Sequence, residues 1–514
     1  MSIHRGVLAA LVLSASFFAP QHALAAAPAA QPKLAAGESV LADGLTIAVR
    51  RATLSPAAAL EVWKVDGLSV HDVVRDEGAA ALEAQPRLAA GESVLADGLT
   101  IAVRRATLSP TAALEVWIVS PSDGYGASAP GVARLAALSI VATKVDGLSL
   151  RDVVRDAGGQ LMVSIFPSST EISVLAPGNA APQLAQALFS RVLHPSIDDA
   201  GLRDARLRLA EQQAVASAEP DVVLRDGLFN QLFSDGPFHA STYGGPDTLR
   251  GLSLADAQTF AAKAYVPANE IAVAVGGSLD ETALAGTITA AAPAAAQTSA
   301  QPSSAHAAPQ SAPFNAGFAD AGGVGLAWMG PPVGDERTST AMDFISDYLT
   351  RPGYGLVAKA VADADPSADF NGQFITLRDA GIFYVTVSGG KRSADAMSAV
   401  IRAAMKPLLD GPMPQADFTR ALAAFRTHTL RDTQTPEELA DNYGWYFAQG
   451  APAYAPAATD MALSGDYYDQ AAALTPQAVY DAAKTYLGAK GVTATVAPRP
   501  ATPATTSMLD GGAR

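Results

Sequence analysis

The two halves of this chain end in the same pattern, and this match limits the folds that it can adopt. Residues 261–265 read Ala-Ala-Lys-Ala-Tyr and precede a strand-like run at 271–275. Residues 482–486 read Ala-Ala-Lys-Thr-Tyr and precede a second strand-like run at 492–496. Because the same order of helix and strand closes both halves, the sequence predicts two homologous domains of class α+β.

A change of composition separates the two halves. Residues 283–313 are rich in Ala, Pro, Ser, Thr and Gln and contain almost no large apolar side chain, which predicts an extended linker. The domains are then expected at 88–282 and 314–498, and residues 499–514 are expected to form a flexible tail. With 514 residues, 49% of them apolar, the chain can bury a core in each domain.

The N-terminal part contains a nearly exact repeat. Leu34–Trp63 recurs as Leu88–Trp117 with one change in 30 positions, and 64–78 recurs as 144–158 with three substitutions. A solenoid needs three or more units of fixed period, so this is a partial tandem duplication. A pair of central strands can fill its place in a sheet only once. We therefore expect 26–87 to be a loosely attached N-terminal extension that partly repeats 88–158, and the sequence leaves open which copy lies in the sheet.

The first 25 residues have the pattern of a secretory signal peptide. His4 and Arg5 precede an apolar run at 6–19, and 23–25 read Ala-Leu-Ala, the small-x-small form of a cleavage site. The alternative, a membrane anchor, is disfavoured because the run is shorter than the roughly 18 to 20 residues that a span needs. The mature protein is therefore expected in the periplasm or secreted, with no membrane span after cleavage.

Charge and cysteine content exclude several classes of partner and site. The formal net charge is −15, which disfavours nucleic acid as a partner. The chain has no cysteine, so disulfides, thiolate metal sites and a lipid-modified cysteine are excluded.

One segment carries a resemblance to a known family. Strand-like runs at 95–103 and 112–119 precede it, and a Gly-Gly pair at 158–159 introduces a further strand after it. In this frame 131–138 resembles the helix that carries His-x-x-Glu-His in the pitrilysin/insulinase family of zinc peptidases, the inverzincin type. The resemblance implies two related α/β sandwich domains that face each other as a clamshell.

The resemblance also shows what has been lost. Arg134, Ala137 and Leu138 occupy the positions of the two histidines and the glutamate, and none of these side chains can bind zinc or polarise a water. The family's third ligand, a glutamate, falls on Gln212 or, with a shift of one, on Glu211, which is a candidate relic. We therefore expect no catalytic residue, no metal and no cofactor in this chain, whereas active relatives hold zinc.

The sequence favours a pseudoenzyme, with one alternative left open. By resemblance, the chain is expected to bind peptides, to pair with an active zinc peptidase subunit of the same family as a heterodimer, or both. Peptides are expected to add a strand to a sheet edge formed by Gln160, Leu161, Met162, Val163 and Ser164. The alternative is a zinc metallopeptidase with unrecognised ligands. However, no two of the seven histidines lie four residues apart, and His239 is interpreted as a structural loop residue.

Overall fold

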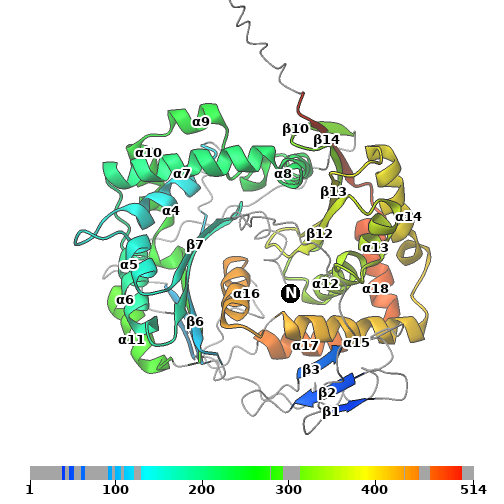
Figure 1. The fold of residues 1–514 in the computed structure, drawn as a ribbon, viewed down its shortest axis with the longest axis horizontal. Coiled ribbons are helices and arrows are strands. Elements are labelled where there is room, and N and C mark those ends of the chain that lie inside the picture. The colour runs from blue at the N-terminus through cyan, green and yellow to red at the C-terminus, as the bar shows by residue number, and fades with distance from the viewer. Residues whose placement is uncertain are drawn as a thin grey trace, which may run out of the picture.

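The computed structural model describes most of the chain from residue 91 onward. The described residues are 38–40, 46–50, 59–63, 91–94, 99–105, 109–120, 129–277, 279–292, 309, 313–432, 434–450 and 463–500. The predicted signal peptide at 1–25 lies outside them, as does the tail beyond residue 500. Two sandwich domains face each other (Figure 1), and the predicted α+β class is confirmed.

The first domain is a six-stranded sheet with helices on its outer face. The strand order is β4-β5-β9-β6-β8-β7. The strands are β4 (Gly91–Val94), β5 (Thr100–Arg105), β6 (Thr111–Val119), β7 (Gln160–Ile165), β8 (Ser169–Pro177) and β9 (Glu270–Gly276). The helices are α4 (Val132–Ala142), α5 (Leu150–Asp156), α6 (Ala181–Val192), α7 (Asp199–Ala218), α8 (Pro220–Leu232), α9 (Pro246–Gly251), α10 (Leu254–Ala264) and α11 (Glu281–Ala291).

The second domain repeats this topology. Its order is β10-β14-β11-β13-β12, and β14 lies parallel to β10 and antiparallel to β11, as β9 does to β5 and β6. The strands are β10 (Phe314–Ala319), β11 (Gly323–Met329), β12 (Asp369–Ile375), β13 (Ile382–Ser388) and β14 (Val492–Pro498). The helices are α12 (Glu336–Thr350), α13 (Leu356–Ala364), α14 (Ala394–Asp410), α15 (Gln415–Arg431), α16 (Pro436–Ala448), α17 (Leu463–Ala472) and α18 (Pro476–Ala482). The matching ends in the sequence are thus the strands β9 and β14 with the helices that precede them.

Each domain covers the inner face of the other domain's sheet with one helix. Helix α8 packs on β10, β11, β13 and β14, whereas α16 packs on β6 and β9. In Figure 1 α16 lies inside the molecule beside β6. Both helices begin with proline at a first-turn position, where its missing N–H costs nothing. As a result, apolar side chains of both sheets belong to one continuous core cluster.

Trp117 is the centre of the contact between α16 and the first sheet. Its ring stacks on Phe166 with centroids 5.5 Å apart and meets Trp445 edge-on at 6.2 Å. Gly444 faces the indole so closely that an added Cβ would collide with its ring atoms. The helix can therefore approach the sheet only because residue 444 has no side chain.

The sequence placed the start of the linker too early. Residues 281–291 form helix α11, which packs against α6 and β5. Leu284, Ile288 and Ala291 are buried and lie three and four residues apart, on one helix face. The first domain therefore extends to about residue 292. Alanine favours helix as readily as it occurs in linkers, so composition alone misplaced this boundary.

The second copy of the repeat supplies the strands β4, β5 and most of β6 to the six-stranded sheet. The first copy forms a separate sheet of β1 (Glu38–Val40), β2 (Thr46–Arg50) and β3 (Ala59–Trp63). The copies diverge just after their shared tryptophan, where Ile118 corresponds to Lys64. Because Ile118 is 1% exposed, a lysine there would bury an ammonium group. This difference favours the second copy over the first as the one that lies in the six-stranded sheet.

Substituting Gly444 should weaken the docking of α16. We expect Gly444→Ala to lower the free energy of unfolding by about 1–3 kcal/mol, because overpacking forces neighbours to move. Gly286→Ala, in α11 with no atom within 4 Å of the new Cβ, is the matched control and should raise it by roughly 0.5–1 kcal/mol. Urea denaturation of both variants measures the difference. Equal effects would show that the close approach to Trp117 is unimportant.

Candidate functional site

The segment that resembles the zinc-binding helix is α4. It follows Gly131, which has a φ of 91° and where an added Cβ would lie 3.2 Å from Tyr243 O. Ala137 and Leu138 are 0% and 3% exposed and belong to the core of the first domain. Two of the three motif positions are therefore packing residues, and replacing them by polar side chains would disrupt the core.

Arg134, at the first motif position, is a buried cation. Its guanidinium lies over the Tyr243 ring, 4.1 Å from the centroid, and Nη1 donates to Gln212 Oε1 at 3.3 Å. Burial lowers the pKa of Arg134, whereas Tyr243 and Asp226 raise it, and a guanidinium keeps its proton even so. The positive charge lies where the resemblance would place zinc, so the residues present do not fit a divalent cation.

The structure distinguishes the two candidates for the third ligand position. Gln212 contacts Arg134, while Glu211, the preceding residue of α7, is exposed. The side chain that faces the motif is thus a neutral amide.

Strand β7 is an end strand of the described six-stranded sheet. The Phe166 amide donates to Ser169 O across the hairpin, and hydrogen-bonded pairs alternate with non-bonded pairs along an antiparallel ladder. Leu161, Val163 and Ile165 therefore direct their N–H and C=O groups to the open edge. This edge can accept an extended segment through backbone bonds alone.

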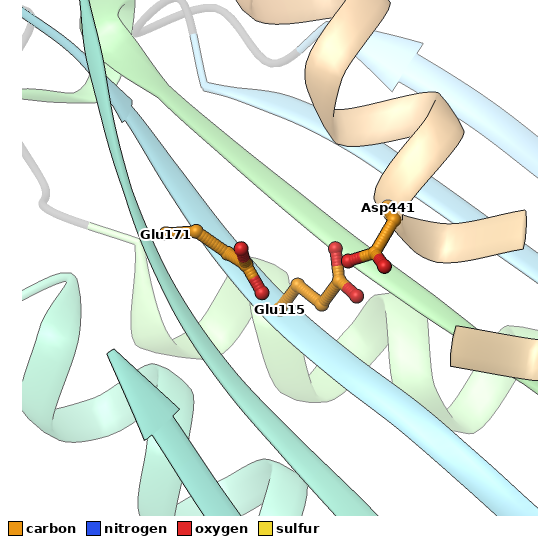
Figure 2. A group of neighbouring side chains, drawn as sticks. All are labelled: Glu115, Glu171 and Asp441. Atoms are coloured by element: carbon orange, nitrogen blue, oxygen red, sulfur yellow. The ribbon is translucent and has the colours of Figure 1, made fainter. Parts of the chain in front are cut away.

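Three buried carboxyl groups meet where α16 covers the first sheet. Glu115 comes from β6, Glu171 from β8 and Asp441 from α16, and one oxygen of each lies within 4.8 Å of the others (Figure 2). Trp117 Nε1 donates to Glu115 Oε2 at 2.7 Å. Glu115 Oε1 is buried and accepts no hydrogen bond within the described part of the chain.

Burial changes the pKa of one member of this carboxylate cluster, which consists of Glu115, Glu171 and Asp441. Desolvation raises the pKa of Glu115 well above its usual value, and the neighbouring Glu171 raises it further, whereas hydrogen bonds from Trp117 and with Asp441 lower it. Glu115 therefore binds its proton more tightly in the folded protein than in the unfolded chain. This cluster was not predicted from the sequence, although a glutamate inside the apolar run Leu114–Val119 was a visible signal.

His239 has the structural role that the sequence predicted. Its Nδ1 lies 2.9 Å from Phe233 O and 3.1 Å from Asn230 O, and Asn230 Nδ2 donates to His239 O. These contacts tie the loop to the end of α8.

Comparisons with known proteins identify the fold. Residues 251–425 match the family model described as "Peptidase M16 inactive domain". A protease from Helicobacter pylori superposes with TM-score 0.70 at 16% identity, covering 80% of this chain and 100% of that one. A peptidase M16 inactive domain from Pseudomonas fluorescens gives 0.65 at 18%, covering 80% and 99%. A chain of Complex III2 from Candida albicans, with Inz-5 bound, gives 0.65 at 14%, covering 79% and 95%. No curated protein matches the chain significantly.

The chain has the M16, or pitrilysin-type, fold. The resemblance stated from the sequence is confirmed, including the degenerate character of the motif. In this M16 scaffold the helix α4 is retained, and its first metal-binding position holds the buried guanidinium of Arg134. The match to an inactive domain supports a non-catalytic protein.

The purified mature protein should hold no stoichiometric zinc and should show no chelator-sensitive peptide cleavage. Arg134 repels a dication, and a single exposed carboxylate such as Glu211 cannot retain one. Metal analysis and a peptide cleavage assay with and without chelator test this. The triple variant Arg134→His, Ala137→Glu, Leu138→His should not restore a good enzyme. Positions 137 and 138 lie in the apolar core, and Gln212 offers a neutral amide where the family has a glutamate ligand. One equivalent of zinc, with activity lost on chelation, would overturn this expectation.

Stability should fall as pH rises through the range in which Glu115 releases its proton. Because the folded pKa is raised, this contribution is fully present below the unfolded pKa of about 4.3 and is lost as pH rises through the folded pKa. Each tenfold difference between the folded and unfolded acid dissociation constants is worth roughly 1.4 kcal/mol. Glu115→Gln should therefore stabilise the protein more at pH 8 than at pH 5, as measured by denaturation. Glu211→Gln is the exposed control, and equal pH profiles for wild type and Glu115→Gln would contradict this view.

Proposed function

We propose that this chain is an exported, non-catalytic M16-type subunit that binds extended peptides along β7 and pairs with an active zinc peptidase of the same family. The observation that carries the proposal is the buried Arg134 guanidinium at the metal position, beside the neutral amide of Gln212. Such a site cannot activate water, so a role in binding rather than hydrolysis fits the chain best.

The open edge of β7 supports the peptide-binding part of the proposal. Helix α16 covers β6 and β9, and β8 separates β6 from β7 in the sheet. The backbone groups of Leu161, Val163 and Ile165 on the open edge thus lie beyond the strands that α16 contacts. Strand addition gains its affinity from main-chain hydrogen bonds, which need no catalytic side chain.

The pairing and the export are supported by less direct features. One structure with this fold is a chain of Complex III2, an assembly. The N-terminal sequence supports export to the periplasm or beyond. Within the described residues, no helix has the length and apolar character of a membrane span.

No observation favours the alternative of a peptidase with unrecognised ligands. Among the described residues, the carboxylate cluster is the one group of three potential ligands. It lacks the histidine nitrogen of the catalytic zinc sites, and its members are at most 4% exposed. A peptide could not reach it without removing α16.

Co-expression with an exported homologue that retains His-x-x-Glu-His should give a stable heterodimer. An interface of about 1,200–2,000 Å² or more is expected for such a complex. Size-exclusion chromatography, together with the peptidase activity of the partner, measures the association. Strictly separate elution, with partner activity unaffected by this chain, would remove the support for a subunit.

A matched pair of variants tests the peptide edge within the same experiment. Val163→Pro removes an N–H that faces the open edge and leaves the β8 ladder intact, so peptide affinity should fall at least several-fold. Ser164→Ala keeps the backbone donors of β7 and is the control. Unchanged peptide binding in Val163→Pro would exclude strand addition at β7.

A further inference from the structure

The repeated 30-residue sequence occurs in two different strand pairings. In the first copy β2 pairs directly with β3, and Thr46 lies opposite Trp63. In the second copy β9 lies between the corresponding strands, and Thr100 and Trp117 both lie opposite Ile271. The two strands of the repeat thus pair directly with each other in the first copy, whereas in the second copy β9 lies between them.

The register of the two arrangements is the same. In the first copy Ala48 pairs with Glu61, and their equivalents Ala102 and Glu115 both lie opposite Val273. The outer ladder agrees as well, because β1 and β2 pair in the same register as β4 and β5. Opening the ladder between β2 and β3 and inserting β9 would therefore reproduce the second copy without a slip that turns side chains to the wrong face.

We propose that the two copies are interchangeable partners of strand β9 within one molecule. In the exchanged state the first copy holds β9 in the six-stranded sheet, and the second copy closes into the hairpin that the first copy forms here. Only 24 residues, 64–87, separate the copies. A short tether gives an effective concentration of about millimolar, so exchange within the chain outcompetes exchange with a second molecule at micromolar concentration.

The residues after the shared tryptophan set the balance between the two states. The second copy continues with the buried Ile118, whereas the first continues with Lys64. The arrangement with the second copy in the sheet is therefore the major state, and the exchanged arrangement is a minor one. Within the 30 repeated positions, Ala57 and Thr111 are the one difference between the copies.

The exchange would change which residues pair with β8 next to the turn between β7 and β8. Ile118 pairs with Thr170, and Val119 pairs with Ser169 beside the hairpin turn. With the first copy in place, Lys64 and Val65 would stand in these positions. The exchange would thus change the anchoring of the strand whose edge binds peptides, a consequence that rests on the proposed function.

Cysteine cross-linking can detect the exchange because the chain has no natural cysteine. Val116 lies opposite Ala272, so Val116→Cys with Ala272→Cys is the positive control and should form a disulfide in most molecules. Val62→Cys with Ala272→Cys can form an intramolecular disulfide only in the exchanged state. Mild oxidation of the full chain, followed by mass spectrometry of unreduced peptides, measures both. This readout requires neither peptide nor partner, so its failure is distinct from failure of the proposed function.

A variant that exchanges the biasing residues sharpens the test. Lys64→Ile with Ile118→Lys should increase the Val62–Ala272 cross-link at least several-fold and decrease the Val116–Ala272 cross-link. If the double variant folds poorly, Lys64→Ile alone serves in its place. This single variant leaves the second copy intact and should also increase the Val62–Ala272 cross-link. The proposal is overturned if the Val62–Ala272 cross-link is absent in every background while the positive control forms. A cross-link found only between differently labelled molecules would also overturn it.

Discussion

Neither sheet of this molecule buries its inner face with helices of its own domain. Helix α16 covers β6 and β9, and α8 covers the second sheet. Both contacts depend on glycine, since a Cβ at Gly227 would crowd Ala316 and one at Gly444 would collide with Trp117. The result is one apolar cluster that continues from one domain into the other. Separating the domains would expose both inner faces, so the burial of these apolar faces holds the two domains together.

The same interface couples the fold to pH. The carboxylate cluster lies under α16 because Glu115 and Glu171 point to the inner face that the helix must cover. Burying three ionised carboxylates side by side would cost far more than an aromatic contact returns. Burial, and then the neighbouring Glu171, raise the pKa of Glu115, which favours its neutral, protonated form. Asp343 in the second domain behaves similarly, because burial raises its pKa to about 7. The folded state therefore binds protons that the unfolded chain releases.

Local sequence patterns predicted the elements of this fold, whereas long-range contacts escaped them. The strand-like runs predicted at 271–275 and 492–496 are the strands β9 and β14. The predicted start of the linker, residue 283, was wrong because alanine occurs in both helices and linkers. The carboxylate cluster could not be predicted, because Glu115 and Asp441 are 326 positions apart and no sequence signal states that α16 crosses to the first sheet.

The loss of the metal motif has different consequences for the core and for the sheet edge. At α4 the replacements became part of the packing, since Ala137 and Leu138 lie in the core and Arg134 is held by Tyr243 and Gln212. Reversal would need several coordinated changes, because each neighbour now suits the replacement. The edge of β7 is different, because the groups that it presents are backbone N–H and C=O, which are independent of side-chain identity. A scaffold that loses its catalytic side chains therefore keeps an open strand edge as long as the sheet folds, because that edge consists of backbone groups.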